Sequence, residues 1–215
     1  MSSPGTIVVS TVLAVIAVGL VLVERGRPDA RRLAVVAALA AAASASRILF
    51  VAIPNFKPVT VIVLVTGATL GPRAGFAVGA LTPLLSNMAL GQGTWTPAQM
   101  ALWGLVGLTG ALLSPVCRTP RGLAVVAFVW GYLFGWGMAV WDLAVLGPVL
   151  NWPAFLTRAG TGFWFDTTHA VAGVVFALAI GAPLTRLLLR YRDRMTVRIL
   201  WTTPPGSPPP VDAPR

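Results

Sequence analysis

The sequence predicts an all-helical integral membrane protein. Of its 215 residues, 56% are hydrophobic and only 10% are charged, whereas a soluble globular domain carries about 25% charged residues to cover its surface. The apolar residues lie in runs long enough to cross a bilayer, because about 20 helical residues span about 30 Å of hydrocarbon. These proportions exclude a soluble globule, a disordered chain and a collagen-like chain, and the single Cys117 excludes an intrachain disulfide.

Seven apolar stretches are candidate membrane spans. The third is short for a straight crossing, so Pro58 and Gly71-Pro72 at its two ends are expected near the interfaces. The first is expected to be a retained helix and not a secretory signal, because it lacks a basic leading segment and Glu24-Arg25 follows it. The stretches are 6–23, 33–53, 59–70, 74–90, 98–116, 123–150 and 162–189.

The distribution of basic residues predicts the orientation. The net charge is +10, and basic residues collect in the cytoplasmic loops of membrane proteins, so the charge needs no nucleic-acid partner. Only Arg47, Lys57 and Arg158 fall on the opposite side, which places the N-terminus outside and the C-terminus in the cytoplasm of a multi-pass protein of the cell membrane. The residues expected on the cytoplasmic side are Arg25, Arg27, Arg31, Arg32, Arg73, Arg118, Arg121, Arg186, Arg190, Arg192, Arg194, Arg198 and Arg215.

Polar residues gather near the predicted outer ends of the spans. Amides, carboxylates, one imidazole and several tryptophans together are typical of a small-molecule pocket. Taken singly, the tryptophans fit the aromatic belt of a membrane interface better than a ligand contact. The outer set comprises Arg47, Asn55, Lys57, Asn87, Gln92, Trp95, Gln99, Asp142, Asn151, Trp152, Arg158, Asp166 and His169.

Asp166 and His169 lie three residues apart, so they share one face of the last span. They could contact a ligand, or His169 could bond inside the bundle while Asp166 caps the helix start. A metal site is not expected, because zinc requires three or four ligands and the chain has one His. Asp142 lies about 32 Å along a helix from Arg121, which returns it to the outer interface.

Two outer loops could cover a pocket. The segment 53–58 is framed by two prolines, and the segment 91–97 combines flexible glycines with Trp95. Ordinary turn chemistry explains these glycines and prolines equally well.

Small residues repeat along the second span. Ala34, Ala38 and Ala42 recur at intervals of four, and such faces let another helix approach closely. They could serve internal packing or the docking of a partner subunit.

The motifs that the sequence lacks exclude further classes of function. The only lysine, Lys57, stands between Phe56 and Pro58, so the chain has no Walker A loop and cannot itself hold ATP phosphates. We also expect no charged residue deep within the spans, whereas proton-coupled transporters usually need such residues. Energy for transport must then come from another protein.

Three stretches together resemble the substrate-binding S component of an energy-coupling factor (ECF) vitamin transporter. The first, within 40–76, contains Arg47-Ile48-Leu49-Phe50, Ile53-Pro54-Asn55-Phe56-Lys57-Pro58 and Leu70-Gly71-Pro72-Arg73. The second, within 79–105, contains Ser86-Asn87, Gly91-Gln92-Gly93-Thr94-Trp95-Thr96-Pro97 and Trp103-Gly104-Leu105. The third, within 165–192, begins with Phe165-Asp166-Thr167-Thr168-His169.

The resemblance implies a six-helix substrate-binding core over 33–198. Such a component binds its vitamin near the outer face and docks on a transmembrane coupling subunit driven by two ATPase subunits. It is not an enzyme and holds no catalytic cofactor. The segment 1–32 departs from the family pattern as an extra N-terminal transmembrane helix with a basic loop, and 199–215 is expected to be a Pro-rich disordered tail.

The loop motifs are most similar to the cobalamin-type branch of this family. A large, amide-rich corrinoid suits a wide pocket, although riboflavin also suits the aromatic residues. Ala34, Ala38 and Ala42 match the family's docking stripe. The residues that we expect around the ligand are Asn55, Lys57, Asn87, Gln92, Trp95, Gln99, Asp166 and His169.

Two other classes of protein stay open. A membrane-embedded enzyme could use Asp142, Asp166 and His169 as acid and base groups. A scaffold rich in small residues could assemble other subunits without binding any small molecule.

Overall fold

The protein is all-helical over the residues that the computed structural model describes, which are 3–25, 30–147 and 150–195. The all-helical class predicted from composition is therefore confirmed for these residues, and the predicted tail at 199–215 lies outside them. The elements are α1 (Ser3–Glu24), α2 (Ala30–Leu49), α3 (Val59–Leu70), α4 (Pro72–Leu90), α5 (Trp95–Leu112), α6 (Ser114–Cys117), α7 (Pro120–Val145), α8 (Trp152–Phe176), the π-helical segment η1 (Ala177–Gly181) and α9 (Ala182–Met195).

Four helical segments are long and apolar enough to cross a membrane. They are Pro4–Glu24, Ala30–Leu49, Pro120–Val145 and the continuous helix Trp152–Arg194. Helix α3, with 12 residues, is a shorter apolar helix. Helices α4 and α5, which also correspond to predicted spans, have 19 and 18 residues and are not among the four. This pattern is compatible with a multi-pass membrane protein.

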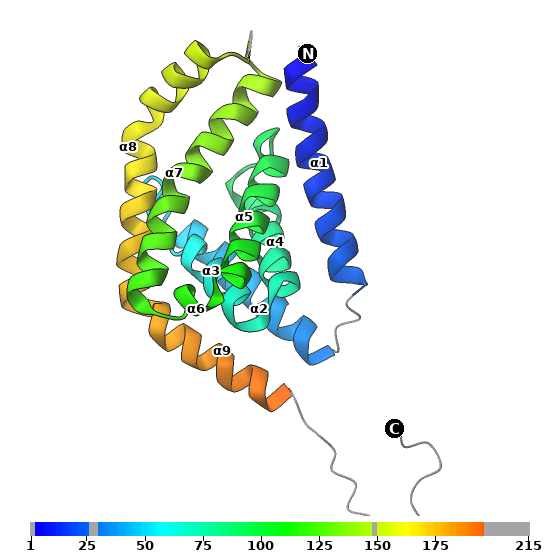
Figure 1. Ribbon diagram of the computed structural model, residues 1–215, viewed down its shortest axis with the longest axis vertical. Helices are drawn as coiled ribbons and strands as arrows, with labels where there is room; N and C mark the ends of the chain where they lie inside the picture. Colours follow the sequence, from blue (N-terminus) through cyan, green and yellow to red (C-terminus); the bar gives the residue numbers. More distant parts are fainter. Residues whose placement is uncertain (1–2, 26–29, 148–149, 196–215) are drawn as a thin grey trace, which may run out of the picture.

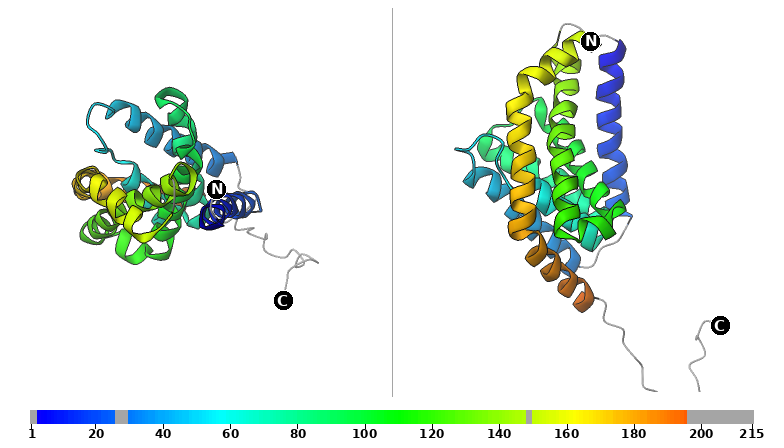
Figure 2. Two further views of the ribbon diagram at one scale, coloured as in Figure 1. Left: turned by 90° about the horizontal axis from the view of Figure 1, so that it is seen from above. Right: turned by 60° about the vertical axis from the view of Figure 1, so that its left-hand side comes forward.

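The long helices α1, α7 and α8 run in roughly the same direction along the molecule, α3 to α6 pack against them, and α2 packs against α3 and α4 (Figure 1). The start of α1, the end of α7 and the start of α8 lie at one end of the molecule, which we call the far end. Helix α9 bends away at the opposite end. Figure 2 shows that the connection from α2 to α3 projects to one side, partway along α8.

Arginines collect at the end where α9 lies, which we call the basic end. Arg31, Arg32, Arg73, Arg192 and Arg194 line neighbouring cavities there, although they come from three different helices. The structure therefore places these predicted cytoplasmic residues together. Arg27, Arg198 and Arg215 lie outside the described residues.

Glycines allow α3, α4 and α5 to approach one another closely. A Cβ atom added to Gly107 of α5 would collide with the backbone of Gly75 in α4, and one added to Gly67 of α3 would collide with the Gly107 carbonyl. Because neighbouring helices lie on both sides of it, α3 is almost entirely buried. The close packing of α3, α4 and α5 fixes the relative positions of the helix ends that carry the candidate site.

Helix α8 begins ten residues earlier than the predicted last span. Asn151 caps it, since its Oδ1 accepts a hydrogen bond of 2.9 Å from the Ala154 amide, and Pro153 occupies the first turn. Asp166 consequently lies well inside α8. The prediction that Asp166 could cap the helix start is therefore wrong.

The glycine contact is tested by Gly107→Ala. The added methyl has no space, so we expect a loss of about 1–3 kcal/mol in the free energy of unfolding and a lower melting temperature in detergent. The matched control is Gly160→Ala in α8, where nothing lies within 4 Å of the added atom. This control should keep or gain stability, by about 0.5–1 kcal/mol, because alanine favours helix. Equal melting of the two variants would contradict the close approach.

Candidate functional site

Arg47, near the end of α2, lies at the centre of the candidate site. Its side chain is only 5% exposed. Nη1 donates hydrogen bonds to Ser86 Oγ and to Asn87 Oδ1, the latter at 2.9 Å, which joins α2 to α4. Its guanidinium also lies 4.9 Å from the centre of the Trp103 ring, a cation–π contact with α5. Among the described residues Arg47 forms no ion pair with a carboxylate.

Amide side chains extend from Arg47 towards the loop between α4 and α5. Asn87 is 1% exposed and donates through Nδ2 to Thr96 Oγ1 at 2.9 Å and to Gln99 Oε1 at 3.0 Å. Thr96 in turn donates to Gln92 Oε1 at 2.8 Å. Three predicted site residues, Asn87, Gln92 and Gln99, thus belong to one hydrogen-bonded network. The network also fixes the loop.

Aromatic rings connect Arg47 to the buried histidine. Trp103 contacts Phe134 of α7 with ring centres 4.5 Å apart, and Phe134 meets His169 of α8 edge-on at 5.3 Å. His169 Nε2 lies 2.8 Å from Thr60 Oγ1, at the start of α3. Side chains from α2, α3, α4, α5, α7 and α8 therefore form one continuous cluster. We call Arg47, Asn87, Trp103, Phe134, His169 and Thr60 the central cluster.

Three buried polar atoms of the central cluster have no hydrogen-bond partner among the described residues. They are Arg47 Nε, Trp103 Nε1 and His169 Nδ1, and Trp103 and His169 are only 2% and 1% exposed. A buried polar group without a partner costs about 1–3 kcal/mol, and native proteins hold few of them. Three such atoms in contiguous side chains make the central cluster the candidate site.

The connection between α2 and α3 holds two of the predicted site residues. Asn55 has a left-handed backbone, with φ of 60°, and its Nδ2 donates to the Phe165 carbonyl at 2.9 Å, which ties this loop to α8. Lys57 is partly buried. Burial, together with the nearby positive charge of Arg47, lowers the pKa of Lys57 from 10.5 to about 8. The loop thus brings a second cation near Arg47.

The remaining predicted residues are less closely tied to the cluster. Trp95 begins α5 and is 42% exposed, and its ring lies beside Gly93. Asp166 is buried where α8 meets Gly135 of α7, since a Cβ on that glycine would strike its carboxylate. No hydrogen bond joins Asp166 to the cluster among the described residues.

Asp142 does not converge with Asp166 and His169. It pairs with Arg158 at 2.8 Å, where both side chains are partly exposed. Along α7 it lies seven residues beyond Gly135, or about 10 Å of helix, from the point where Asp166 packs. The three groups suggested for acid–base catalysis are therefore spread over two levels of the bundle. Within the described residues no three His, Cys, Asp or Glu side chains gather into a metal-binding group.

The predicted docking residues lie on an open face. Ala34, Ala38 and Ala42 are all exposed, whereas Ala40 and Ala43 on the other side of α2 are fully buried. Ala34 and Ala38 also line a cavity of about 570 Å³ between α2 and α9 at the basic end. The alanines of α2 that pack inside the bundle are therefore Ala40 and Ala43, and not the predicted docking residues.

Arg47 was predicted among the outer polar residues but not as a binding residue, and Trp103, Phe134 and Thr60 were not predicted at all. The signal for Arg47 was available: it is the single charged residue in an alanine-rich span between Arg32 and Lys57. No local signal distinguishes Trp103 from the other seven tryptophans. Its role depends on contacts between distant helices.

Comparison with known proteins adds no assignment. The chain matches no protein-family model, no curated protein and no solved structure.

The pKa of Lys57 gives a prediction for stability. Between pH 8 and 10.5 the unfolded chain holds the Lys57 proton and the folded chain has lost it, so folding becomes more favourable as the pH rises. Below about pH 8 the charged, buried amine disfavours folding. Lys57→Met should therefore melt higher than the wild type at pH 7, and this advantage should shrink towards pH 10. Lys57→Arg, whose charge does not titrate in this range, is the control and should show no such relief; melting curves in detergent measure all three. A wild-type-to-Met difference that stays constant with pH would refute the shift.

Proposed function

We propose that this chain is the membrane-embedded substrate-binding subunit of an ECF-type ABC importer. It takes up a vitamin, for which cobalamin is the proposed ligand, from the side of the far end and binds it at the central cluster. It then delivers the vitamin by docking on a transmembrane coupling subunit powered by two partner ATPase subunits. In this proposal the far end faces outward and the basic end faces the cytoplasm. The six helical segments from α2 onward that pack around the central cluster correspond to the substrate-binding core.

The observation that carries the proposal is the set of three unpartnered polar atoms in the central cluster. Arg47 Nε and Trp103 Nε1 can only donate hydrogen bonds, whereas His169 Nδ1 can donate or accept. A catalytic site needs groups that exchange protons with a substrate, while a binding site needs fixed donors with apolar walls. The cluster is of the second kind, because Trp103 and Phe134 supply the walls and Arg47 a permanent charge.

The two loops that carry the family resemblance border this cluster. Asn87, Thr96 and Gln92 tie the 91–94 loop to Arg47, and Trp141 of α7 holds the same loop by donating to the Thr94 carbonyl at 2.9 Å. Asn55 fixes the other loop to α8. A ligand that reached the cluster would pass between these loops, so their movement would admit it.

The chemistry of the donors favours a ligand rich in acceptor groups. The amide carbonyls of a corrinoid can accept from Arg47 and Trp103, and Asn87 and Gln99 can exchange hydrogen bonds with its amides. A smaller vitamin with aromatic rings, such as riboflavin, would stack on Trp103 and Phe134 instead. The acceptor-rich ligand uses the unpartnered donors more fully, which is why cobalamin is the ligand proposed.

Ligand binding is tested by titrating cobalamin into the purified, emptied chain and by recording the absorbance spectrum of material that co-purifies. Trp103→Phe keeps an aromatic ring but removes the unpartnered N–H and leaves a small cavity. We expect a smaller loss of thermal stability than in the control below, because the cavity cost is partly offset by the loss of a buried unsatisfied donor. We expect affinity about tenfold lower, since one hydrogen bond to the ligand is missing. The matched control is Trp141→Phe, which loses a satisfied hydrogen bond and should melt lower.

The outcomes separate the alternatives. Trp103→Phe binding as tightly as the wild type would remove Trp103 from the site. Tight binding of another vitamin would keep the transport function and reject the corrinoid. Product turnover by the isolated chain would identify an enzyme, and absence of any ligand would leave a scaffold.

Docking is tested by Ala38→Trp. The bulky side chain on the exposed face of α2 should block the approach of the coupling subunit while leaving ligand binding intact, because Ala38 faces away from the central cluster. Vitamin uptake by cells should fall to background. The control is Val125→Trp, an equally large change at a 63% exposed position of α7, which should retain uptake. Uptake that survives Ala38→Trp would place the docking face elsewhere.

A further inference from the structure

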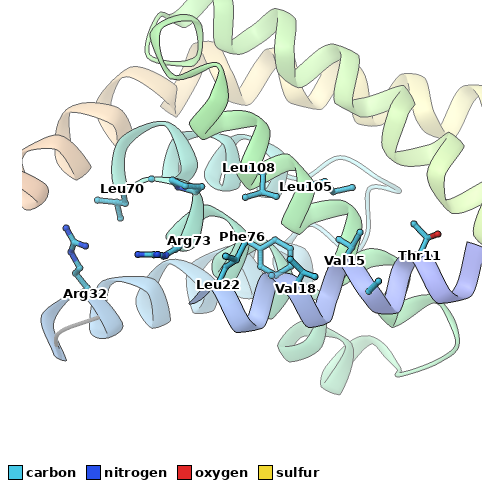
Figure 3. A pocket seen from close by; sticks show the side chains of 14 residues that line it. Thr11, Val15, Val18, Leu22, Arg32, Leu70, Arg73, Phe76, Leu105 and Leu108 are labelled. Carbon is cyan, nitrogen blue, oxygen red and sulfur yellow. The ribbon is translucent and has the colours of Figure 1, made fainter. Parts of the chain in front are cut away.

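A cavity of about 740 Å³ lies between α1 and the pair α4 and α5 (Figure 3). Its walls are mainly apolar, and the polar side chains among them are Thr11, Arg32 and Arg73. Phe76 of α4 lies against Gly19, where a Cβ atom would strike the ring, so α1 touches the bundle there. Elsewhere along its length α1 is mostly exposed. The residues lining the cavity include Val15, Val18 and Leu22 of α1 and Leu105 and Leu108 of α5.

The length of the cavity matches one leaflet of a bilayer. Its lining on α1 runs from Thr11 to Leu22, and the eleven steps between them measure about 16 Å at 1.5 Å per residue. One leaflet contributes half of a hydrocarbon core about 30 Å thick, or about 15 Å. An acyl chain that enters from the basic end would therefore be accommodated along its length.

Positive charge lies at one end of this apolar cavity. Arg32 and Arg73 stand at the basic end in Figure 3, next to Leu22 and Leu70, whereas Thr11 marks the opposite end. A second, smaller cavity of about 110 Å³ shares Arg32, Leu70 and Arg73 and adds Arg192 of α9. Neither lining contains Asp or Glu, although Arg192 pairs with Asp193, the next residue of α9, at 3.2 Å. Arginines from three helices thus converge where the two cavities meet.

We propose that this cavity binds an anionic phospholipid, with an acyl chain between α1 and α5 and the headgroup phosphate against Arg32 and Arg73. Arginine pairs well with phosphate because its planar donors can contact two oxygens at once, and basic pockets between transmembrane helices on one side of the membrane favour anionic headgroups. The arginines of this cavity lie at the basic end, and no residue of the central cluster lines it. The site does not depend on the proposed transport function.

The site is tested by native mass spectrometry of the full chain in detergent with dioleoyl phosphatidylglycerol or dioleoyl phosphatidylcholine, two lipids with the same acyl chains. We expect the anionic lipid to be retained at least about fivefold more strongly. The double variant Arg32→Gln with Arg73→Gln should reduce its affinity about tenfold or more and abolish the preference. The control is Arg121→Gln with Arg186→Gln, which removes two exposed charges from outside the cavities and should leave the preference intact.

The apolar part of the site is tested by Val15→Trp, which fills the cavity. This variant should lose both lipids while keeping the melting temperature of the wild type. Equal retention of the two lipids by the wild type would overturn the proposal, as would equal losses in the two arginine variants. Co-purification of a neutral molecule in place of phospholipid would overturn it too. Cobalamin binding is measured on the same preparations, so failure of the lipid site is distinguished from failure of the transport function.

Discussion

Burial of the Arg47 guanidinium is the constraint on which the arrangement of the bundle depends. A cation in an apolar interior is costly unless hydrogen bonds and charge satisfy it, and Arg47 has no carboxylate partner among the described residues. Asn87 and Ser86 accept from it and Trp103 lies beneath it. The ends of α2 and α4 must therefore stay in register with the middle of α5. The glycine contacts between α3, α4 and α5 hold that register, because they leave these helices no freedom to slide apart.

Two loops border the central cluster, and a few side-chain hydrogen bonds hold them in place. The side chains of the cluster belong to packed helices, whereas loops with few contacts open locally at a lower free energy. In the proposed function, movement of these loops would admit and release the ligand while the helices keep the cluster in place.

Periodicity and composition predicted the all-helical class, and the bounds of α3 were predicted to the residue. The start of α8 was missed because Asn151-Trp152-Pro153, a good helix start, precedes the strongly apolar part of the segment by ten residues. Prediction from the sequence grouped Asn87, Gln92 and Gln99, which the structure joins in one hydrogen-bonded network, because they lie in or beside the short loop between α4 and α5; their role in binding stays a prediction. It could not find Trp103 or Phe134, because their contacts join α5, α7 and α8 and leave no pattern in any one helix.

The continuous helix formed by α8, η1 and α9 runs from the far end of the molecule to the basic end and bends between α8 and α9. The helix Trp152–Arg194 has 43 residues, or about 64 Å, roughly twice the hydrocarbon thickness of a bilayer, so it cannot cross as one straight rod. The π-helical segment Ala177–Gly181 and Pro183 interrupt its regular hydrogen bonding, and α9 turns away (Figure 1). Helix α9 is amphipathic, with Leu188 buried and several arginines exposed, as in helices that lie along a membrane surface. Its bend carries Arg192 to the proposed lipid site and Arg194 to the groove beside Ala34 and Ala38, so lipid and coupling subunit would meet the chain at adjacent faces of one basic end.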